Sequence, residues 1–595
     1  MATHSVVNQA PPRVDVDEFA ANLPLREGVS RYDAGWATEA LDEVGRLVGS
    51  AAFQRDAELA NLHEPQLRAF DRWGNRIDEV EYDDGYHRVI AAAVAAGAHT
   101  SAWAEPRPGA NVARAATFML FAQVEPGHAC PVSMTHAAVP ALAASGSLAD
   151  EWMPRLLSRD YDGSLRAAKS SALFGMAMTE KQGGSDVRAN TTRALADGEG
   201  RWLLTGHKWF CSAPMSDAFL VLAQTASGLS CFLVPRMLED GTRNVFRIQR
   251  LKDKLGNRSN ASGEVEFEDT VGYLLGEEGR GVRTILEMVN RTRLDCVYGS
   301  AAGMRQAVAE AAWHVRHRAA FGSALADQPA MRSVLADLAL ESEAATTVAL
   351  RLARAHDADA PETDAAFRRL ATAVTKYWVC KRGPGHAYEA LECLGGNGYT
   401  EAFPLARRYR EQPVMAIWEG SGNVIALDVL RAMRREPAAW EAFDAELAAA
   451  RGVYRTYDGH HDRVRARIAA CVASADADPV VAEASVRPLV ASLALALQAS
   501  LLIRDAPDAV ADAFVAARLG PERGPSTASC PPASTSPPSS PAPDALARRV
   551  RRRQQFLSNS GRTRRSARKT QELLASADGT ESAGTDGTGA APIAR

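Results

Sequence analysis

Apolar residues recur three and four positions apart along most of the first 175 residues, for example in 115–121. This spacing is typical of amphipathic helices. Between about 176 and 275 the pattern changes to short apolar runs separated by turn residues, which is typical of strands. The runs are 202–204, 219–222, 231–234 and 265–267. We therefore predict a mostly helical domain followed by a small β domain.

Helical spacing returns after Gly281 and continues in longer segments to about residue 520. The predicted helices are 282–318, 329–356, 362–395, 424–433, 437–455, 461–474 and 480–518. The first three are long enough to pack as a helical bundle. The last three lie beyond the bundle and predict an additional helical domain.

The predicted fold class is thus α+β, with helical segments before and after one β domain. The predicted domains are 1–175 (helical), 176–280 (β), 281–436 (bundle), 437–520 (additional helices) and 521–595 (tail). Residues 521–543 contain eight prolines and six serines, a composition that buries too little apolar surface to offset chain entropy. We expect the tail to be disordered. Its basic second half has no acidic residue between Asp544 and Glu572, a change that a frame error would also produce.

The overall composition is that of an ordinary globular protein, with 46% hydrophobic residues, 24% charged residues and a net charge of −4. The eight cysteines form no CxxC pair and have no zinc-like spacing to histidine, which predicts reduced thiols and no metal site. No apolar run approaches the roughly 18 residues of a membrane span, and the N-terminus lacks the regions of a signal peptide. We expect a cytoplasmic protein without a membrane segment.

A polar segment with two adjacent glycines, 178–186, opens the predicted β domain. Adjacent glycines let the backbone approach a ligand closely. The hydroxyls of Thr179 and Ser185 can bond the polar edge of a ring or a pyrophosphate. Taken alone, the same residues are equally typical of a structural turn.

Glu419 lies in the segment 417–423, where the following glycine leaves room for a ligand. Removing a proton from the carbon beside a thioester needs a base, and burial raises the pKa of a carboxylate toward that task. We predict that Glu419 is the catalytic base. The alternative is a surface carboxylate in a turn.

These two segments resemble signatures of the acyl-CoA dehydrogenase family, as do 206–212, 255–260, 275–281, 318–328 and 392–411. The resemblance implies an FAD cofactor, an acyl-CoA substrate and a middle β domain that binds the flavin between helical domains. It assigns cofactor contacts to Met178, Thr179, Gly184, Ser185, Phe210, Cys211, Ser212, Arg318, Phe321, Gln328, Leu394, Gly395, Gly396, Ile417, Trp418, Ser421 and Asn423. Arg318, Phe321 and Gln328 have the spacing by which one subunit contacts FAD bound in its neighbour. For Cys211, a half-buried strand position is the simpler interpretation.

Two positions on the predicted helix 282–318 depart from the family pattern. Asn290 stands where many members place an aspartate near the substrate. Thr292 stands directly before Arg293, where some members carry their base. Asn290 and Arg293 are the predicted substrate contacts, and we expect altered acyl-CoA recognition beside a retained base at Glu419.

Within the family, the chain resembles the AidB-type alkylation-response branch. The stretches that carry this likeness are 7–9, 178–186, 228–232, 250–262 and 418–431. The branch implies a homotetramer with FAD, an additional helical domain that binds double-stranded DNA, and at most weak acyl-CoA dehydrogenase activity. Arg431, Arg434 and Arg435 are three and four positions apart, which places them on one helix face. They are the predicted DNA contacts, because clustered arginines suit phosphates.

The interpretation we favour is a DNA-associated flavoprotein that shields DNA or destroys alkylating agents. A metabolic acyl-CoA dehydrogenase would instead use Glu419 as its base and pass electrons to an electron-transfer flavoprotein. A third alternative is a flavin oxidase of related fold. A nitroalkane oxidase would be expected to carry aspartate at position 419, so the glutamate argues against it.

Overall fold

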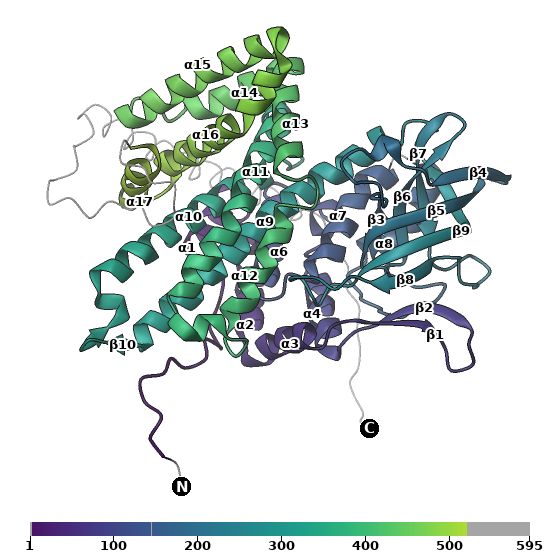
Figure 1. The fold of residues 1–595 in the computed structure, drawn as a ribbon, viewed down its shortest axis with the longest axis horizontal. Helices are drawn as coiled ribbons and strands as arrows, with labels where there is room; N and C mark the ends of the chain where they lie inside the picture. Colours follow the sequence, from purple (N-terminus) through teal and green to yellow (C-terminus); the bar gives the residue numbers. More distant parts are fainter. Residues whose placement is uncertain (1–2, 144, 521–595) are drawn as a thin grey trace, which may run out of the picture. The chain divides into compact units, whose positions relative to one another are not determined.

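The computed structural model describes residues 3–143 and 145–520, so the predicted disordered tail at 521–595 lies outside the described residues. Within this range, residues 3–451 and 456–520 belong to one compact unit. The chain has a helical N-terminal part, a middle β domain, a C-terminal helical part and extra C-terminal helices (Figure 1). The predicted α+β fold class is confirmed.

The N-terminal part is mainly helical, as predicted (Figure 1). Its helices are α1 (Leu23–Arg31), α2 (Thr38–Gly49), α3 (Ala51–Leu62), α4 (Asp84–Ala95), α5 (Ser101–Ala104), α6 (Ala110–Ala122), α7 (Ala129–Ala143) and α8 (Gly146–Leu157). A hairpin of β1 (Gln66–Phe70) and β2 (Arg76–Glu81) interrupts the helices and was not predicted. Every second residue of β1 is exposed, so the strand carries only a weak apolar signal.

Seven strands form the β domain. They are β3 (Phe174–Ala177), β4 (Arg193–Gly198), β5 (Arg201–Ser212), β6 (Ala218–Thr225), β7 (Gly228–Pro235), β8 (Arg247–Leu251) and β9 (Ser262–Leu275). Hydrogen bonds join them in the order β3, β6, β4, β5, β9, β7, and β8 also pairs with β9. Because β7 pairs with β6 as well, the path from β6 to β7 closes on itself as a barrel.

The helices of the bundle follow the β domain. Four of them match the prediction to within a few residues: α9 (Gly281–His317), α10 (Pro329–Arg354), α11 (Glu362–Glu392) and α13 (Gly422–Arg435). The fifth, α12 (Pro404–Met415), was not predicted. Two short strands, β10 (Ala319–Ala320) and β11 (Ser323–Ala324), form a hairpin between α9 and α10. The additional helices are α14 (Pro437–Ala448), α15 (Arg455–Ala477), α16 (Pro479–Asp505) and α17 (Asp508–Phe514).

Helix α16 corrects the expectation about apolar segments. It is 27 residues long and, by length and composition, apolar enough to cross a membrane. Its polar residues interrupt every apolar run, so the sequence contains no uninterrupted apolar run of membrane-spanning length at this helix. Of its most apolar window, 72% is buried inside the molecule, and it packs against α10, α11 and α13. Its composition is therefore explained by packing in the core of the bundle.

Two hydrophobic clusters meet at the loop before Glu419. One joins α7 and α8 to strands of the β domain and to the start of α9, and Met178 and Trp418 pack against it. The other consists of Cys296, Cys380 and Met415, and Trp418 packs against it too. The loop is thus held between the β domain and the bundle.

Candidate active site

Glu419 lies in the loop between α12 and α13 and has a left-handed backbone, with φ +58°. The next residue, Gly420, also has a positive φ of +109°. A left-handed conformation in a residue other than glycine costs about 1–3 kcal/mol and persists only where its surroundings enforce it. The loop must therefore be held from outside.

Two cations from different helices, one buried and one half-buried, hold this loop. Lys376 of α11, 1% exposed, donates from Nζ to the carbonyl oxygens of Trp418 at 2.8 Å and Gly420 at 2.5 Å. Arg293 of α9 donates from Nε to the Glu419 carbonyl at 3.0 Å. Three successive carbonyls thus accept from positive charges. Charge-assisted bonds of this kind are about twice as strong as neutral ones.

Arg293 is itself oriented by Asp428 of α13, through an ion pair at 2.9 Å. Arg293 was predicted as a substrate contact, but its Nε and Nη1 are used within the chain. The geometry makes it a residue that positions Glu419. Asn290, the other predicted substrate contact, is half-buried one turn earlier on α9.

The Glu419 carboxyl has the surroundings of a base. Burial raises its pKa above the usual value, against a hydrogen bond from Thr292 and the charges of Arg293 and Lys376, which lower it. Its Oε2 is buried without a hydrogen-bond partner among the described residues, as is Nε1 of Trp418. Unpaired buried polar atoms are costly, so these two atoms indicate where a ligand would bind.

The Cys130 thiol is close enough to the same carboxyl to interact with its charge. Burial raises the pKa of the Cys130 thiol at the start of α7 to about 11, and the charge of Glu419 also raises it, whereas a hydrogen bond involving Ser212 lowers it. The hydroxyl of Ser212 and the charge of Glu419 thus both act on this thiol.

The segment 178–186 forms a tight loop beside β5. The carbonyl of Thr179 accepts from the Trp209 amide at 2.8 Å. A Cβ at Gly184 would lie 2.5 Å from Oγ1 of Thr179, so only glycine fits there. The neighbouring Glu180 and Lys208 form a fully buried ion pair at 2.9 Å. The loop is thus fixed, while Gly184 and Ser185 are exposed at its surface.

The strand β5 presents its residues alternately. Phe210 is 51% exposed and Ser212 is half-buried, whereas Cys211 is 0% exposed and belongs to the apolar interior of the sheet. The thiol of Cys211 therefore faces away from Phe210 and Ser212. Of the three predicted cofactor contacts on this strand, Cys211 can contribute only its backbone.

The remaining predicted cofactor residues fall into two groups. The first group flanks Glu419 and consists of Ile417, Trp418, Ser421 and Asn423. Trp418 is half-buried, and the other three are exposed. The second group is Arg318, Phe321, Gln328, Leu394, Gly395 and Gly396. One hydrophobic cluster joins the ends of α9 and α11 beside this second group.

The second group lies far from Glu419 within the chain. Arg293, which contacts Glu419, and Arg318 are 25 positions apart by number on α9, about 37 Å at 1.5 Å per residue. One cofactor molecule cannot reach both groups within a single chain. If Arg318 and Phe321 contact FAD, they contact FAD bound in another subunit.

The three predicted DNA contacts lie on α13, the helix that begins directly after the Glu419 loop. All three side chains are exposed. Arg431 is 63% exposed, and its Nη1 lies 3.9 Å from the Asp428 carboxylate. The exposed arginine face therefore starts about three turns of helix from the candidate base.

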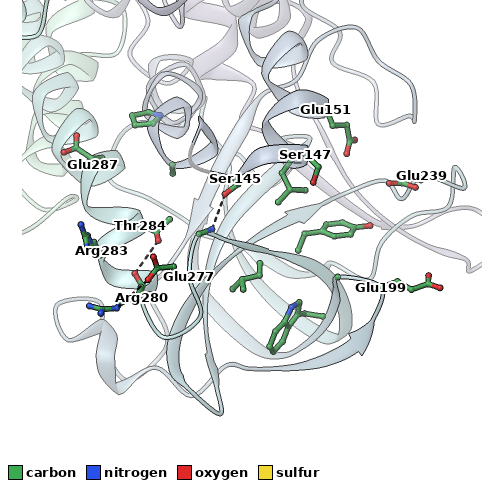
Figure 2. Close-up of a pocket in the computed structure, with 18 residues that line it drawn as sticks. Ser145, Ser147, Glu151, Glu199, Glu239, Glu277, Arg280, Arg283, Thr284 and Glu287 are labelled. Carbon is green, nitrogen blue, oxygen red and sulfur yellow. Dashed lines mark hydrogen bonds and ion pairs between the residues drawn. The ribbon is translucent and has the colours of Figure 1, made fainter.

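Figure 2 shows a second pocket. Its volume is about 950 Å³, and Glu419 is not among the residues that line it. It is bounded by the α7–α8 corner, the strands β5 and β9, and the start of α9. Its charged lining consists of Glu151, Glu199, Glu239, Glu277, Glu287, Arg280 and Arg283. Five carboxylates against two guanidinium groups repel phosphates, so this pocket does not fit a dinucleotide.

The sequence did not single out the residues that hold Glu419. Lys376 lies in a long amphipathic helix. Asp428 lies in a segment in which only the arginines were predicted to be functional. Neither stands in a motif. The only signal for Lys376 is a lysine at a position that helical spacing assigns to the buried face.

Comparisons with known proteins agree with this architecture. Three family models match: the adaptive response protein AidB N-terminal domain at 8–163, the acyl-CoA dehydrogenase middle domain at 175–270 and the acyl-CoA dehydrogenase C-terminal domain at 279–434. The chain is 47% identical to the putative acyl-CoA dehydrogenase AidB of Escherichia coli (strain K12), over 77% of this chain and 85% of that protein.

Two further likenesses are to one Caenorhabditis elegans protein. Acyl-CoA dehydrogenase family member 11 is 29% identical over 67% of each chain. The crystal structure of C. elegans ACDH-11 in complex with C11-CoA has a TM-score of 0.79 and 25% identity, and the match covers 87% of this chain and 93% of that one.

Proposed function

The chain belongs to the acyl-CoA dehydrogenase family, in its AidB-type branch, and we propose that it is an FAD-containing flavoprotein of the DNA alkylation response. In this proposal a cytoplasmic homotetramer binds double-stranded DNA and shields it or destroys alkylating agents. Acyl-CoA dehydrogenation is at most a weak activity. The observation that carries the proposal is the exposed arginine face of α13, the helix that begins directly after the loop of Glu419.

The residues around Glu419 fit FAD. Oε2 of Glu419 and Nε1 of Trp418 are buried without partners in the described part of the chain. Gly184 packs so closely against Thr179 that no residue larger than glycine fits at position 184. The next residue, Ser185, is exposed. Thr179, Ser185, Phe210 and Ser212 would hold the flavin. Ser421 and Asn423, at the start of α13, would hold its phosphates, because helix N-termini favour anions.

Bound FAD would supply the hydride acceptor. Glu419 would take the proton from the carbon beside the thioester, and its raised pKa suits that transfer. The apolar cluster of Cys296, Cys380 and Met415 packs against Trp418, the residue directly before Glu419. Lys376 and Arg293 keep Glu419 in its left-handed conformation and lower its pKa, which limits the effect of burial.

Replacing Arg431, Arg434 and Arg435 together with alanine is expected to weaken duplex DNA binding. In a plot of the logarithm of the binding constant against the logarithm of the salt concentration, each lost phosphate contact reduces the slope by about one. Fluorescence anisotropy of a labelled duplex, titrated at several salt concentrations, measures both quantities. Weakening should be similar for unrelated DNA sequences, because phosphates carry no sequence information.

The matched control replaces Arg46, Arg55 and Arg68, which are exposed on α2, α3 and β1. It removes the same total charge from another part of the protein. If both triple variants weaken binding equally, net charge explains the attraction and the α13 face has no special role.

A metabolic acyl-CoA dehydrogenase is the second candidate. The raised pKa of Glu419 favours it, and the C. elegans ACDH-11 structure contains C11-CoA. This protein would then contact an electron-transfer flavoprotein. Anaerobic mixing with acyl-CoAs of different length separates the candidates. Rapid bleaching of the flavin absorbance, together with no retention of duplex DNA, would favour the metabolic enzyme.

A further inference from the structure

The N-terminal segment 4–13, here called the strap, is bonded to the hairpin of β10 and β11. The side chain of Asn8 donates from Nδ2 to the Ala319 carbonyl at 2.9 Å and accepts from the Ala319 amide at 2.8 Å. One side chain thus satisfies both backbone groups of Ala319, as a neighbouring strand would. Asn8 has a left-handed backbone, with φ +55°, which asparagine tolerates better than most residues.

Further bonds fix the strap and the hairpin against each other. Arg318 donates from Nη1 to the Asn8 carbonyl at 2.5 Å. Trp313 of α9 donates from Nε1 to the Pro11 carbonyl at 2.8 Å. Beyond the strap, Gln328 donates from Nε2 to the Ala320 carbonyl at 3.1 Å. Two of the residues predicted to contact FAD, Arg318 and Gln328, are therefore part of this bonded unit.

The hairpin itself is too small to be stable alone. Each strand has two residues, and isolated two-stranded hairpins are at best marginally stable in water. Phe321 at its tip is 100% exposed, and its left-handed φ is +54°. Because the Phe321 side chain is fully exposed, it makes no packing contact in the described part of the chain that would offset the strain of its backbone. The outside support comes from Asn8 and Gln328.

We propose that Asn8 is a positioning residue for the cofactor. The strap sets the hairpin in the conformation in which Arg318 and Phe321 meet FAD bound in a second copy of the chain. This inference rests on the proposed function, because it requires FAD and a contact between subunits. It adds to that function a role for the strap, whose contact with Arg318 lies about 37 Å along α9 from the region of Glu419.

The test measures how fast holoprotein loses flavin. Purified holoprotein is diluted, and released flavin is followed by its fluorescence. Asn8→Gly removes both side-chain bonds and keeps the left-handed backbone, so we expect release about tenfold faster. Asn8→Asp keeps the acceptor and loses the donor, so we expect an intermediate rate. Gln9→Gly is the matched control, since Gln9 is exposed beside Asn8, and should release flavin like the unaltered protein.

Two further measurements separate the ways in which the inference can fail. Arg318→Ala tests the hairpin contact itself: if it speeds flavin release while Asn8→Gly does not, the positioning role of Asn8 is wrong. If Arg318→Ala leaves release unchanged, the subunit-crossing contact of the proposed function fails. Hydrogen exchange at the Ala319 amide should quicken in Asn8→Gly at an unchanged melting temperature. A lower melting temperature without faster exchange there would contradict the inference.

Discussion

Replacing Glu419 with glutamine is expected to remove measurable flavin reduction by acyl-CoA, while flavin content and duplex DNA binding stay as they are. Glutamine has the same shape but cannot accept the proton. A general base contributes about 10²–10⁴-fold to rate, so an already weak activity should fall below detection. Anaerobic stopped-flow absorbance at the flavin band, with a panel of acyl-CoAs, is the measurement.

The control for this variant is Glu287→Gln, which removes a carboxylate from the acidic pocket on the same helix as Thr292. It should reduce flavin at the rate of the unaltered protein. Unchanged bleaching by Glu419→Gln would show that the base is another group. Loss of bound flavin would show that Glu419 serves cofactor binding instead.

The pH dependence of the same reaction has a definite sign. Burial raises the pKa of Glu419 above its usual value, and only the carboxylate can accept a proton. Flavin reduction should therefore rise with pH through a pKa higher than that of an ordinary glutamate. A profile that is flat down to the range of exposed carboxyl groups would contradict this assignment.

Stability should follow the opposite trend. A carboxyl whose pKa is raised in the folded state binds its proton more tightly there than in the unfolded state. Its contribution to stability is full below the unfolded pKa and is lost as pH rises through the folded pKa. Glu419→Gln should therefore gain stability relative to the unaltered protein as pH rises, as measured by urea unfolding.

Replacing Lys376 with methionine is expected to produce the second large effect. The carbonyls of Trp418 and Gly420 would lose their donor, and hydrogen bonds to charged groups contribute about 1.5–3 kcal/mol each. Removing a buried charge offsets part of this loss. We expect the free energy of unfolding to fall by about 2–4 kcal/mol and flavin reduction to fall at least tenfold, because Glu419 is no longer held in its left-handed conformation.

Urea unfolding and stopped-flow flavin reduction measure the two consequences separately. Lys381→Met is the control for stability, since Lys381 is exposed on the same helix. If Lys376→Met is destabilised but reduces flavin normally, Lys376 supports the fold and not the conformation of Glu419. If Lys376→Met changes neither the free energy of unfolding nor flavin reduction, the loop keeps its conformation without Lys376.

Some of the site could be predicted because its residues are neighbours in the sequence. Thr179 and Gly184 pack together within one loop, and Glu419 stands beside the glycine that shares its positive φ. The orientation of Cys211 was also predictable, because successive side chains of a strand point to opposite faces. Phe210 is exposed and Cys211 is buried, as that alternation requires.

The rest depends on contacts between distant parts of the chain. Arg293 and Asp428 are 135 positions apart, and Lys376 and Trp418 are 42 apart, so no local pattern connects them. The bond between Asn8 and Ala319 spans 311 positions. The predicted substrate role of Arg293 came from its place in a family pattern. Its neighbours in space, Asp428 and the Glu419 carbonyl, suggest a different role.

Binding of DNA through α13 is tested by a titration of duplex DNA binding against salt, with the full-length holoprotein and with residues 1–520. With the phosphate contacts on α13, binding is expected to be salt-sensitive and to have the same slope for both proteins. Binding that is absent, or that disappears when residues 521–595 are removed, would contradict this expectation.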